Sequence, residues 1–278
     1  MRSLLAALTL LSLPQAVLGQ SADPQYAFPL WELGLGAVGR VASDYPGADD
    51  YSTSASPIPY IRYRGKILEL GGEDALRLNA VRGERFRLGF SLDSSKRVAG
   101  RVSALGNLLP DLDRLVEFGP ELSYRLADQS ALFAKTGSGR LDMLLQWRGV
   151  FAIDGFQPDY EGSVMRPALR YSEYGSLSPG SRIRLGIGPI FATKGVQGFY
   201  YDEDGFEADG GYLGLETRLA IRYPVTPRWQ IIGGISGTYL GGSTNRDSTL
   251  MASDWDATAF IGVTYAIFQS KTKTFRDN

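Results

Sequence analysis

The chain has 278 residues, with 29 lysines and arginines against 30 aspartates and glutamates, and it contains neither cysteine nor histidine. Disulfides, Cys/His metal centres, cysteine nucleophiles and histidine-based catalytic triads are therefore excluded. Because acid–base catalysis near neutral pH relies most often on histidine, we expect no enzymatic activity, cofactor or metal. The net charge of −1 predicts no nucleic-acid partner. The 34 glycines and the 12% aromatic content favour a β protein.

The first nineteen residues have the features of an export signal. Arg2 is followed by an apolar stretch (Leu4–Leu13), and Val17 and Gly19 place small residues before a cut at Gln20. Ten apolar residues are too few to cross a bilayer as a helix. We therefore expect a cleaved signal peptide over 1–19 and a periplasmic N-terminal segment over 20–30. An outer-membrane β-barrel over 31–268 and a polar C-terminal tail over 269–278 follow.

Apolar and polar residues alternate in segment after segment. In Tyr212–Tyr223 (YLGLETRLAIRY), leucine and isoleucine occupy one face, and glycine, glutamate and arginine occupy the other. Arg85–Asp93 and Arg182–Phe191 repeat this pattern. Alternation of this length predicts strands with one apolar and one polar face. No segment has a comparably strong helical pattern.

A soluble sandwich and a membrane barrel both fit alternating strands. Aromatic residues near the ends of the apolar rows, and a second face rich in glycine and arginine, favour an all-β transmembrane antiparallel barrel. We expect twelve strands, over 31–42, 53–63, 66–71, 75–81, 85–93, 117–126, 141–151, 164–172, 182–192, 210–223, 228–240 and 255–268. The stretch 66–81 keeps its apolar residues at one parity, so it forms either one strand or two.

An even number of strands places both termini in the periplasm. The expected outer loops are then 43–52, 94–116, 152–163, 193–209 and 241–254. The longest expected periplasmic connections are 127–140 and 173–181. The outer loops are acidic, most densely from Asp202 to Asp209. Solvated loops are the simplest interpretation, and a weak divalent-cation site shared with lipopolysaccharide phosphates is the alternative.

Six short motifs resemble the MipA/OmpV family of outer-membrane proteins, in the family's order and over nearly all of the mature chain. They are W-E-L-G-L-G from Trp31, D-Y-P-G from Asp44, P-I-P-Y-I-R-Y-R-G from Pro57, N-L-L-P-D-L-D from Asn107, E-F-G-P-E-L-S-Y from Glu117 and G-P-I-F-A-T-K from Gly188. The motif positions are Trp31, Glu32, Gly34, Asp44, Tyr45, Pro46, Gly47, Pro59, Tyr60, Tyr63, Arg64, Gly65, Gly119, Pro120, Gly188 and Pro189.

The resemblance implies a scaffold in the Gram-negative outer membrane, in contact with its lipid and lipopolysaccharide. Such a scaffold links a murein-degrading lytic transglycosylase to a murein-synthesising penicillin-binding protein. The residues themselves leave two alternatives open. One is a small-molecule channel with a basic lumen, and the other is a surface adhesin that acts through the outer loops.

The charged face of the strands predicts the contents of the lumen. The residues expected there in a charge network are Arg85, Arg87, Glu117, Glu121, Arg125, Arg148, Arg182, Arg184, Glu216, Arg218 and Arg222, joined by parity with Arg62, Arg77, Arg166, Arg170, Glu32, Glu69, Asp93 and Asp142. The first hypothesis is a plug of arginine–carboxylate pairs, with Arg182, Arg184, Arg218 and Arg222 bound to Glu216, Glu117 and Glu121. The alternative is an anion-preferring pore, because arginine is in excess.

Overall fold

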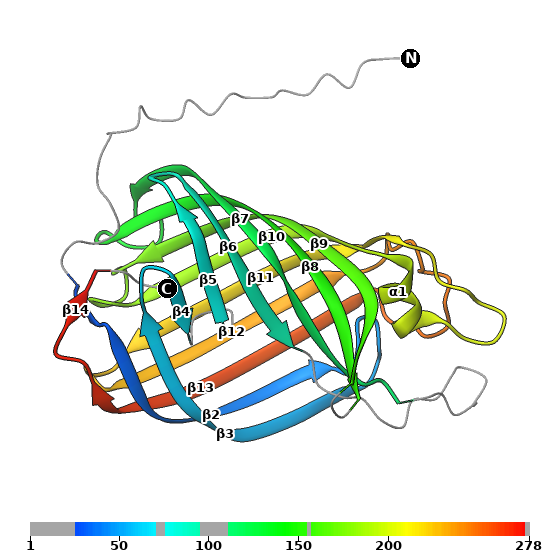
Figure 1. Ribbon diagram of the computed structural model, residues 1–278, viewed down its shortest axis with the longest axis horizontal. Coiled ribbons are helices and arrows are strands. Elements are labelled where there is room, and N and C mark those ends of the chain that lie inside the picture. The colour runs from blue at the N-terminus through cyan, green and yellow to red at the C-terminus, as the bar shows by residue number, and fades with distance from the viewer. Residues whose placement is uncertain (1–25, 71–75, 95–110, 155–156, 276–278) are drawn as a thin grey trace, which may run out of the picture.

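The computed structural model of the chain describes residues 26–70, 76–94, 111–154 and 157–275 (Figure 1). Strands β2 to β13 follow one another in chain order around a closed antiparallel barrel, in which β13 pairs with β2. Their bounds are β2 Trp31–Ser43, β3 Tyr51–Arg64, β4 Leu68–Leu70, β5 Leu76–Arg82, β6 Phe86–Ser94, β7 Arg114–Ser130, β8 Ser138–Asp154, β9 Gln157–Tyr174, β10 Arg182–Ala192, β11 Gly211–Pro224, β12 Trp229–Tyr239 and β13 Trp255–Gln269.

The strand faces are sorted as the alternation predicts. Along β8, Asp142, Leu144 and Arg148 are buried, whereas Met143, Leu145 and Trp147 between them are exposed. The barrel therefore turns its apolar side chains outward and its charged ones inward. This is the reverse of a soluble fold, in which the apolar face is buried.

Two expected loops are largely strand. The expected outer loop 152–163 is wrong, because β8 continues to Asp154 and β9 begins at Gln157. The register there brings Phe151 opposite Tyr160, with ring centroids 5.4 Å apart. At the other end β7 reaches Ser130 and β8 begins at Ser138, so the connection expected over 127–140 shortens to 131–137. Tertiary pairing extends strands through sequence that lacks apolar alternation.

The stretch 66–81 forms two strands, β4 and β5, which pair through Leu68 and Leu78. Because β4 is short, only Tyr63 and Arg64 of β3 pair with it, and within the described residues the rest of β3 is an edge on this side. Pro57 and Pro59 lie in that part of β3. Proline lacks an N–H, so it is tolerated at an edge and leaves fewer donors for unwanted pairing.

Three elements were not predicted. Helix α1 (Lys194–Tyr201) occupies part of the expected loop 193–209. Strands β1 (Phe28–Pro29) and β14 (Lys273–Thr274) form a separate two-stranded sheet, so the N-terminal segment and the C-terminal tail pair with each other at the barrel end opposite α1 (Figure 1). We call this the terminal end, and the other the helix end. No helix among the described residues is long and apolar enough to cross a membrane.

Candidate functional site

The predicted lumen residues fall into distinct places. The prediction that Arg85 faces the lumen is wrong, because β6 begins at Phe86 and Arg85 is exposed in the preceding turn. Arg87 is half-buried in β6, and Arg125 pairs with Asp128 at 3.4 Å in β7. The side chains of Glu69, Arg77 and Asp93 lie outside the described residues. Buried inward-facing members are Glu32, Arg62, Glu121, Asp142, Arg148, Arg170, Arg182, Arg184 and Arg222.

Two lumen carboxylates are each shared between two guanidinium groups. Glu117 accepts two hydrogen bonds from Arg166, at 2.5 and 2.9 Å, and lies 3.6 Å from Arg148. Sequence reasoning paired Glu117 with arginines of β10 and β11, but these two come from β9 and β8. The forked, charge-assisted bond from Arg166 thus links β9 to β7 across the intervening strand β8.

Asp142 is the second shared carboxylate. It accepts a hydrogen bond from Arg140 at 2.9 Å and lies 3.9 Å from Arg170. Glu121 on the same wall accepts a hydrogen bond from the amide of Gln146 at 2.7 Å. With one carboxylate serving two arginines at two places, guanidinium groups outnumber carboxylates along this wall of the described lumen.

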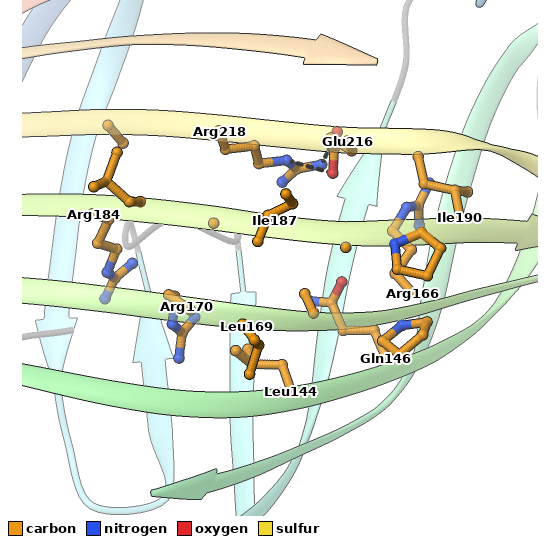
Figure 2. A pocket seen from close by; sticks show the side chains of 17 residues that line it. Leu144, Gln146, Arg166, Leu169, Arg170, Arg184, Ile187, Ile190, Glu216 and Arg218 are labelled. Carbon is orange, nitrogen blue, oxygen red and sulfur yellow. Dashed lines mark hydrogen bonds and ion pairs between the residues drawn. The ribbon is translucent and has the colours of Figure 1, made fainter. Parts of the chain in front are cut away.

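The predicted pairing of Arg218 with Glu216 is present. Arg218 contacts both carboxylate oxygens of Glu216, each at 2.8 Å, while 47% of its side chain stays exposed. Figure 2 shows this pair at the edge of a cavity of about 90 Å³, with Arg166, Arg170 and Arg184 on neighbouring strands. Side chains therefore do not fill the lumen completely here, and a small arginine-lined space remains.

At the terminal end, the N-terminal segment enters the barrel mouth. The ring of Phe28 lies 5.0 Å from the guanidinium carbon of Arg64 on β3 and 5.1 Å from that of Arg222 on β11. Arg64 also donates to the carbonyl of Pro29 at 2.7 Å and to Glu32 at 2.9 Å. The ring therefore gains cation–π attraction from two cations, one on each of two strands of the barrel wall.

Glu32 joins this arrangement to the C-terminal tail. It accepts hydrogen bonds from Tyr60 at 2.9 Å and from the amide of Gln269 at 3.3 Å. We call the arrangement of β1, β14, Glu32, Arg64 and Arg222 the terminal clasp. The motif residues Glu32, Tyr60 and Arg64 are thus a buried polar network that secures both chain ends, which explains why they occur together.

At the helix end, α1 and the loops 202–210 and 240–254 form a cap with its own apolar core. Tyr201, Leu240 and Met251 are buried there against Val150 and Ile190 of the barrel wall. The rest of that core is Leu115, Ala152, Val164, Ala192, Val196, Ala208, Leu213 and Leu250. Apolar side chains from strands and loops therefore fill this part of the barrel end.

The D-Y-P-G motif ties the β2–β3 loop to this cap. Tyr201 donates a hydrogen bond to the carbonyl of Pro46 at 2.8 Å, and Tyr45 stacks on Tyr200 with centroids 6.5 Å apart. Gly47 has φ +85, and a Cβ there would lie 2.8 Å from Met251. Only glycine meets both the backbone and the space requirement. The motif therefore holds the β2–β3 loop against the cap.

The acidic run of the cap is engaged by its own surroundings. Asp202 accepts from the backbone N–H of Ala208, and Glu203 accepts from the backbone and hydroxyl of Thr249. Lys194 bonds Glu207, which raises the pKa of Lys194 and lowers that of Glu207. Among the described residues no group of three or more acidic side chains is placed to hold a metal.

The remaining motif positions shape the strands. Trp31 and Tyr63 are cross-strand partners with outward side chains, and Gly65 follows in the β3–β4 turn. The pairs Gly119-Pro120 and Gly188-Pro189 lie where the β7–β8 and β9–β10 ladders are interrupted. Gly34, Gly119 and Gly188 approach a neighbouring strand's carbonyl so closely that a Cβ would lie 1.8 to 2.1 Å from its oxygen.

Sequence reasoning missed Phe28, Gln269 and the cap core. Phe28 precedes the first alternating segment, so no periodic signal included it. The cap residues are separated along the chain by polar loop sequence, which is a composition typical of solvated loops. A weak signal existed in K-G-V-Q-G-F-Y-Y (Lys194–Tyr201), where apolar residues recur at helical spacing.

An antiparallel barrel with an apolar outside and a charged inside has the architecture of outer-membrane β-barrels. The model of the family described as MltA-interacting protein MipA matches residues 35–267. The chain therefore belongs to the MipA family.

Among curated proteins no match is found. Among solved structures, the chain is similar to the CymD monoaromatic hydrocarbon channel at 9% identity and TM-score 0.35, covering 89% of this chain and 91% of that one. The toluene transporter TbuX of Ralstonia pickettii matches at 12% identity and TM-score 0.29, covering 86% and 89%. Scores this low carry no information about what this chain binds.

Proposed function

We propose that this protein is an outer-membrane barrel that anchors a murein-degrading lytic transglycosylase of the MltA kind by its terminal end. The observation that carries the proposal is the family match, which runs from β2 to β13 and so includes nearly the whole barrel. A penicillin-binding protein is a second partner implied by the resemblance. Binding of either enzyme requires the terminal end to face the periplasm.

The aromatic residues support a membrane position. Trp229 pairs with Tyr265 at the terminal end, and Tyr239 pairs with Trp255 at the helix end. Ten residues of β12 separate the two levels, which is roughly 33 Å along the strand and about 25 Å along the axis at a tilt of about 40°. That spacing suits the apolar band of an outer membrane, where aromatic girdles meet lipid and lipopolysaccharide headgroups. We include in the proposal a twelve-stranded barrel preceded by a cleaved signal peptide over 1–19.

The terminal end offers a surface suited to a protein partner. Its turns and tail expose Leu132, Leu177, Val225 and Phe275 to solvent. Lys135, Lys271 and Lys273 lie on the same turns and tail. Exposed apolar residues among charges are typical of protein interfaces. The clasp holds the tail against the N-terminal segment, so that surface is presented without a large ordering cost on binding.

The arginine-lined cavity favours a second candidate, a channel. We give the anchor precedence because the clasp places Phe28 in one mouth and the cap core lies in the other. A solute crossing the barrel must pass both. The adhesin alternative rests on the acidic cap loops alone, and their side chains are largely engaged within the cap.

Capture of a purified MltA-type transglycosylase on the immobilised, detergent-solubilised full chain tests this proposal. The wild type should retain the enzyme. The double variant Leu132→Asp, Leu177→Asp should lose it, because charge replaces the exposed apolar contacts at the terminal end. Asp204→Lys, at the helix end, is the matched control and should behave as wild type. A wild type that fails to retain the enzyme contradicts the anchor, and equal loss in the control contradicts docking at the terminal end.

A further inference from the structure

Large apolar side chains face the lumen from three strands, although the alternation places mainly polar residues and glycine there. Ile58 of β3, Ile232 of β12 and Phe260 of β13 have the parity of the buried inward residues on their strands. All three line a cavity of about 450 Å³. We call them the inward patch. Because β2 lies between β13 and β3, the patch extends over consecutive strands of the barrel (Figure 1).

Inward glycines let the patch lie close against the barrel wall. A Cβ at Gly234 would lie 2.7 Å from a ring carbon of Phe260, and a Cβ at Gly36 would lie 3.3 Å from Cγ1 of Ile58. The apolar side chains therefore cover glycine backbone, and the cavity lies in front of them. Apolar surface that faces a water-filled lumen is unfavourable, and an apolar ligand in the cavity removes that cost.

A buried hydroxyl in the lining of this cavity lacks a partner. The side chain of Thr264 is 3% exposed, and within the described part of the chain its oxygen has no hydrogen bond. Other polar lining groups are engaged, since Gln230 accepts from Arg62 at 3.3 Å and Tyr60 donates to Glu32 at 2.9 Å. Burying a hydroxyl without a partner is unfavourable. A ligand that hydrogen-bonds Thr264 offsets this cost.

The charged lining residues limit what that ligand needs to carry. All of them have interactions within the chain, and they are Arg62, Arg182, Arg184, Arg218 and Arg222. The ligand therefore needs no negative charge. A threonine hydroxyl both donates and accepts, so one neutral hydroxyl or carbonyl oxygen is sufficient to pair with Thr264.

We propose that this cavity binds a small neutral molecule with a carbon skeleton and a hydroxyl or carbonyl group. The skeleton packs on the inward patch, and the oxygen forms a hydrogen bond with Thr264. Small-molecule sites are typically cavities of roughly 300–1,000 Å³ with a largely apolar lining and a few polar groups that fix orientation. This site goes beyond anchoring a murein enzyme, which needs no ligand in the lumen.

Cysteine protection in the full chain, folded in detergent, tests the site. The native chain has no cysteine, so Ile232→Cys places a single thiol in the cavity. Menthol, a cyclic alcohol, and its parent hydrocarbon p-menthane are the probes. Each should slow the reaction of this thiol with a methanethiosulfonate reagent in a saturable manner. Thr226→Cys, in the exposed β11–β12 turn, is the control thiol and should react equally fast with and without either probe.

Thr264→Val, added to Ile232→Cys, tests the hydrogen bond. It keeps the shape of the side chain and removes a hydroxyl without a partner, so the variant should fold. It should weaken protection by menthol roughly three- to tenfold, as expected for one lost hydrogen bond, and leave protection by p-menthane unchanged. Each probe is compared between proteins, because micelles take up the two probes to different extents.

Thr238→Val is the matched control. Thr238 is buried on the neighbouring strand β12 and lies outside the lining of this cavity, so both probes should protect as they do without the substitution. Absence of saturable protection by menthol overturns the proposal, as does a thiol at position 232 that stays unreactive in the folded protein. Equal weakening of both probes by Thr264→Val, or equal weakening of menthol by Thr238→Val, also overturns it.

Discussion

The ring of Phe28 lies 5.1 Å from the guanidinium carbon of Arg222. Arg222 also lines a lumen cavity between β3 and β10 to β13. Phe28, which precedes the first barrel strand β2, thus contacts a side chain of the lumen directly. Arg222 further donates to the carbonyl of Gly180 at 3.3 Å, in the β9–β10 turn. The clasp therefore links the N-terminal segment, the tail, a turn and the lumen in one arrangement.

Phe28→Ala should lower the free energy of unfolding by about 3 kcal/mol, since it removes a buried ring and two cation–π contacts. The temperature at which the folded band converts to the unfolded band on a semi-native gel measures this loss. Phe275→Ala is the control, because Phe275 is exposed at the same end. If both variants melt at the wild-type temperature, Phe28 does not secure the clasp.

Two isosteric carboxylate variants should differ in their effect. Glu117→Gln leaves Arg148 and Arg166 without their shared anion in a mostly buried site and should cost roughly 3 kcal/mol. Glu216→Gln breaks a pair whose arginine is half-exposed, so it should cost less than about 1 kcal/mol. Gel-shift melting compares them directly. A larger loss for Glu216→Gln would mean that the cavity beside it is dry.

The lipid face is tested on one strand. Ile235→Arg places a charge at an outward position midway along β12 and should cost roughly 2–4 kcal/mol in a bilayer. Ser236→Arg, the next residue, points into the lumen and should leave insertion intact. Folding titrations into lipid vesicles measure both variants. Equal, small effects in a protein that stays dissolved without lipid or detergent contradict the membrane assignment.

The proposed orientation places the helix end outside the cell and the terminal end in the periplasm. Cysteines introduced singly at Asp50 and Asp204, in helix-end loops, should react with an impermeant maleimide on intact cells. A cysteine at Thr226, in the β11–β12 turn of the terminal end, should react only after the outer membrane is permeabilised. The native chain has no cysteine, so the background is clean. Labelling at Thr226 on intact cells reverses the orientation proposed for the barrel.

The strands were predictable because alternation is local. β2, β10 and β13 agree with the predicted spans to within a residue at each end, and the Arg218–Glu216 pair follows from parity on one strand. The lengths of β8 and β9 were not predictable, because Gln157–Ser163 lacks alternation and forms a strand only through its pairing with β8. The clasp and cap depend on contacts such as Tyr201 with Pro46, 155 positions apart. No local pattern encodes contacts at that separation.

The proposal of an anchor rather than an open pore rests on the clasp at one barrel mouth and the cap at the other, and planar-bilayer recording of the purified wild type tests it most directly. The account predicts no steady conductance, because a solute must pass Phe28 at one end and the cap core at the other. Stable anion-selective conductance by the wild type, abolished by Arg218→Ala with Arg222→Ala while gel-shift melting is unchanged, would contradict the account and establish a channel.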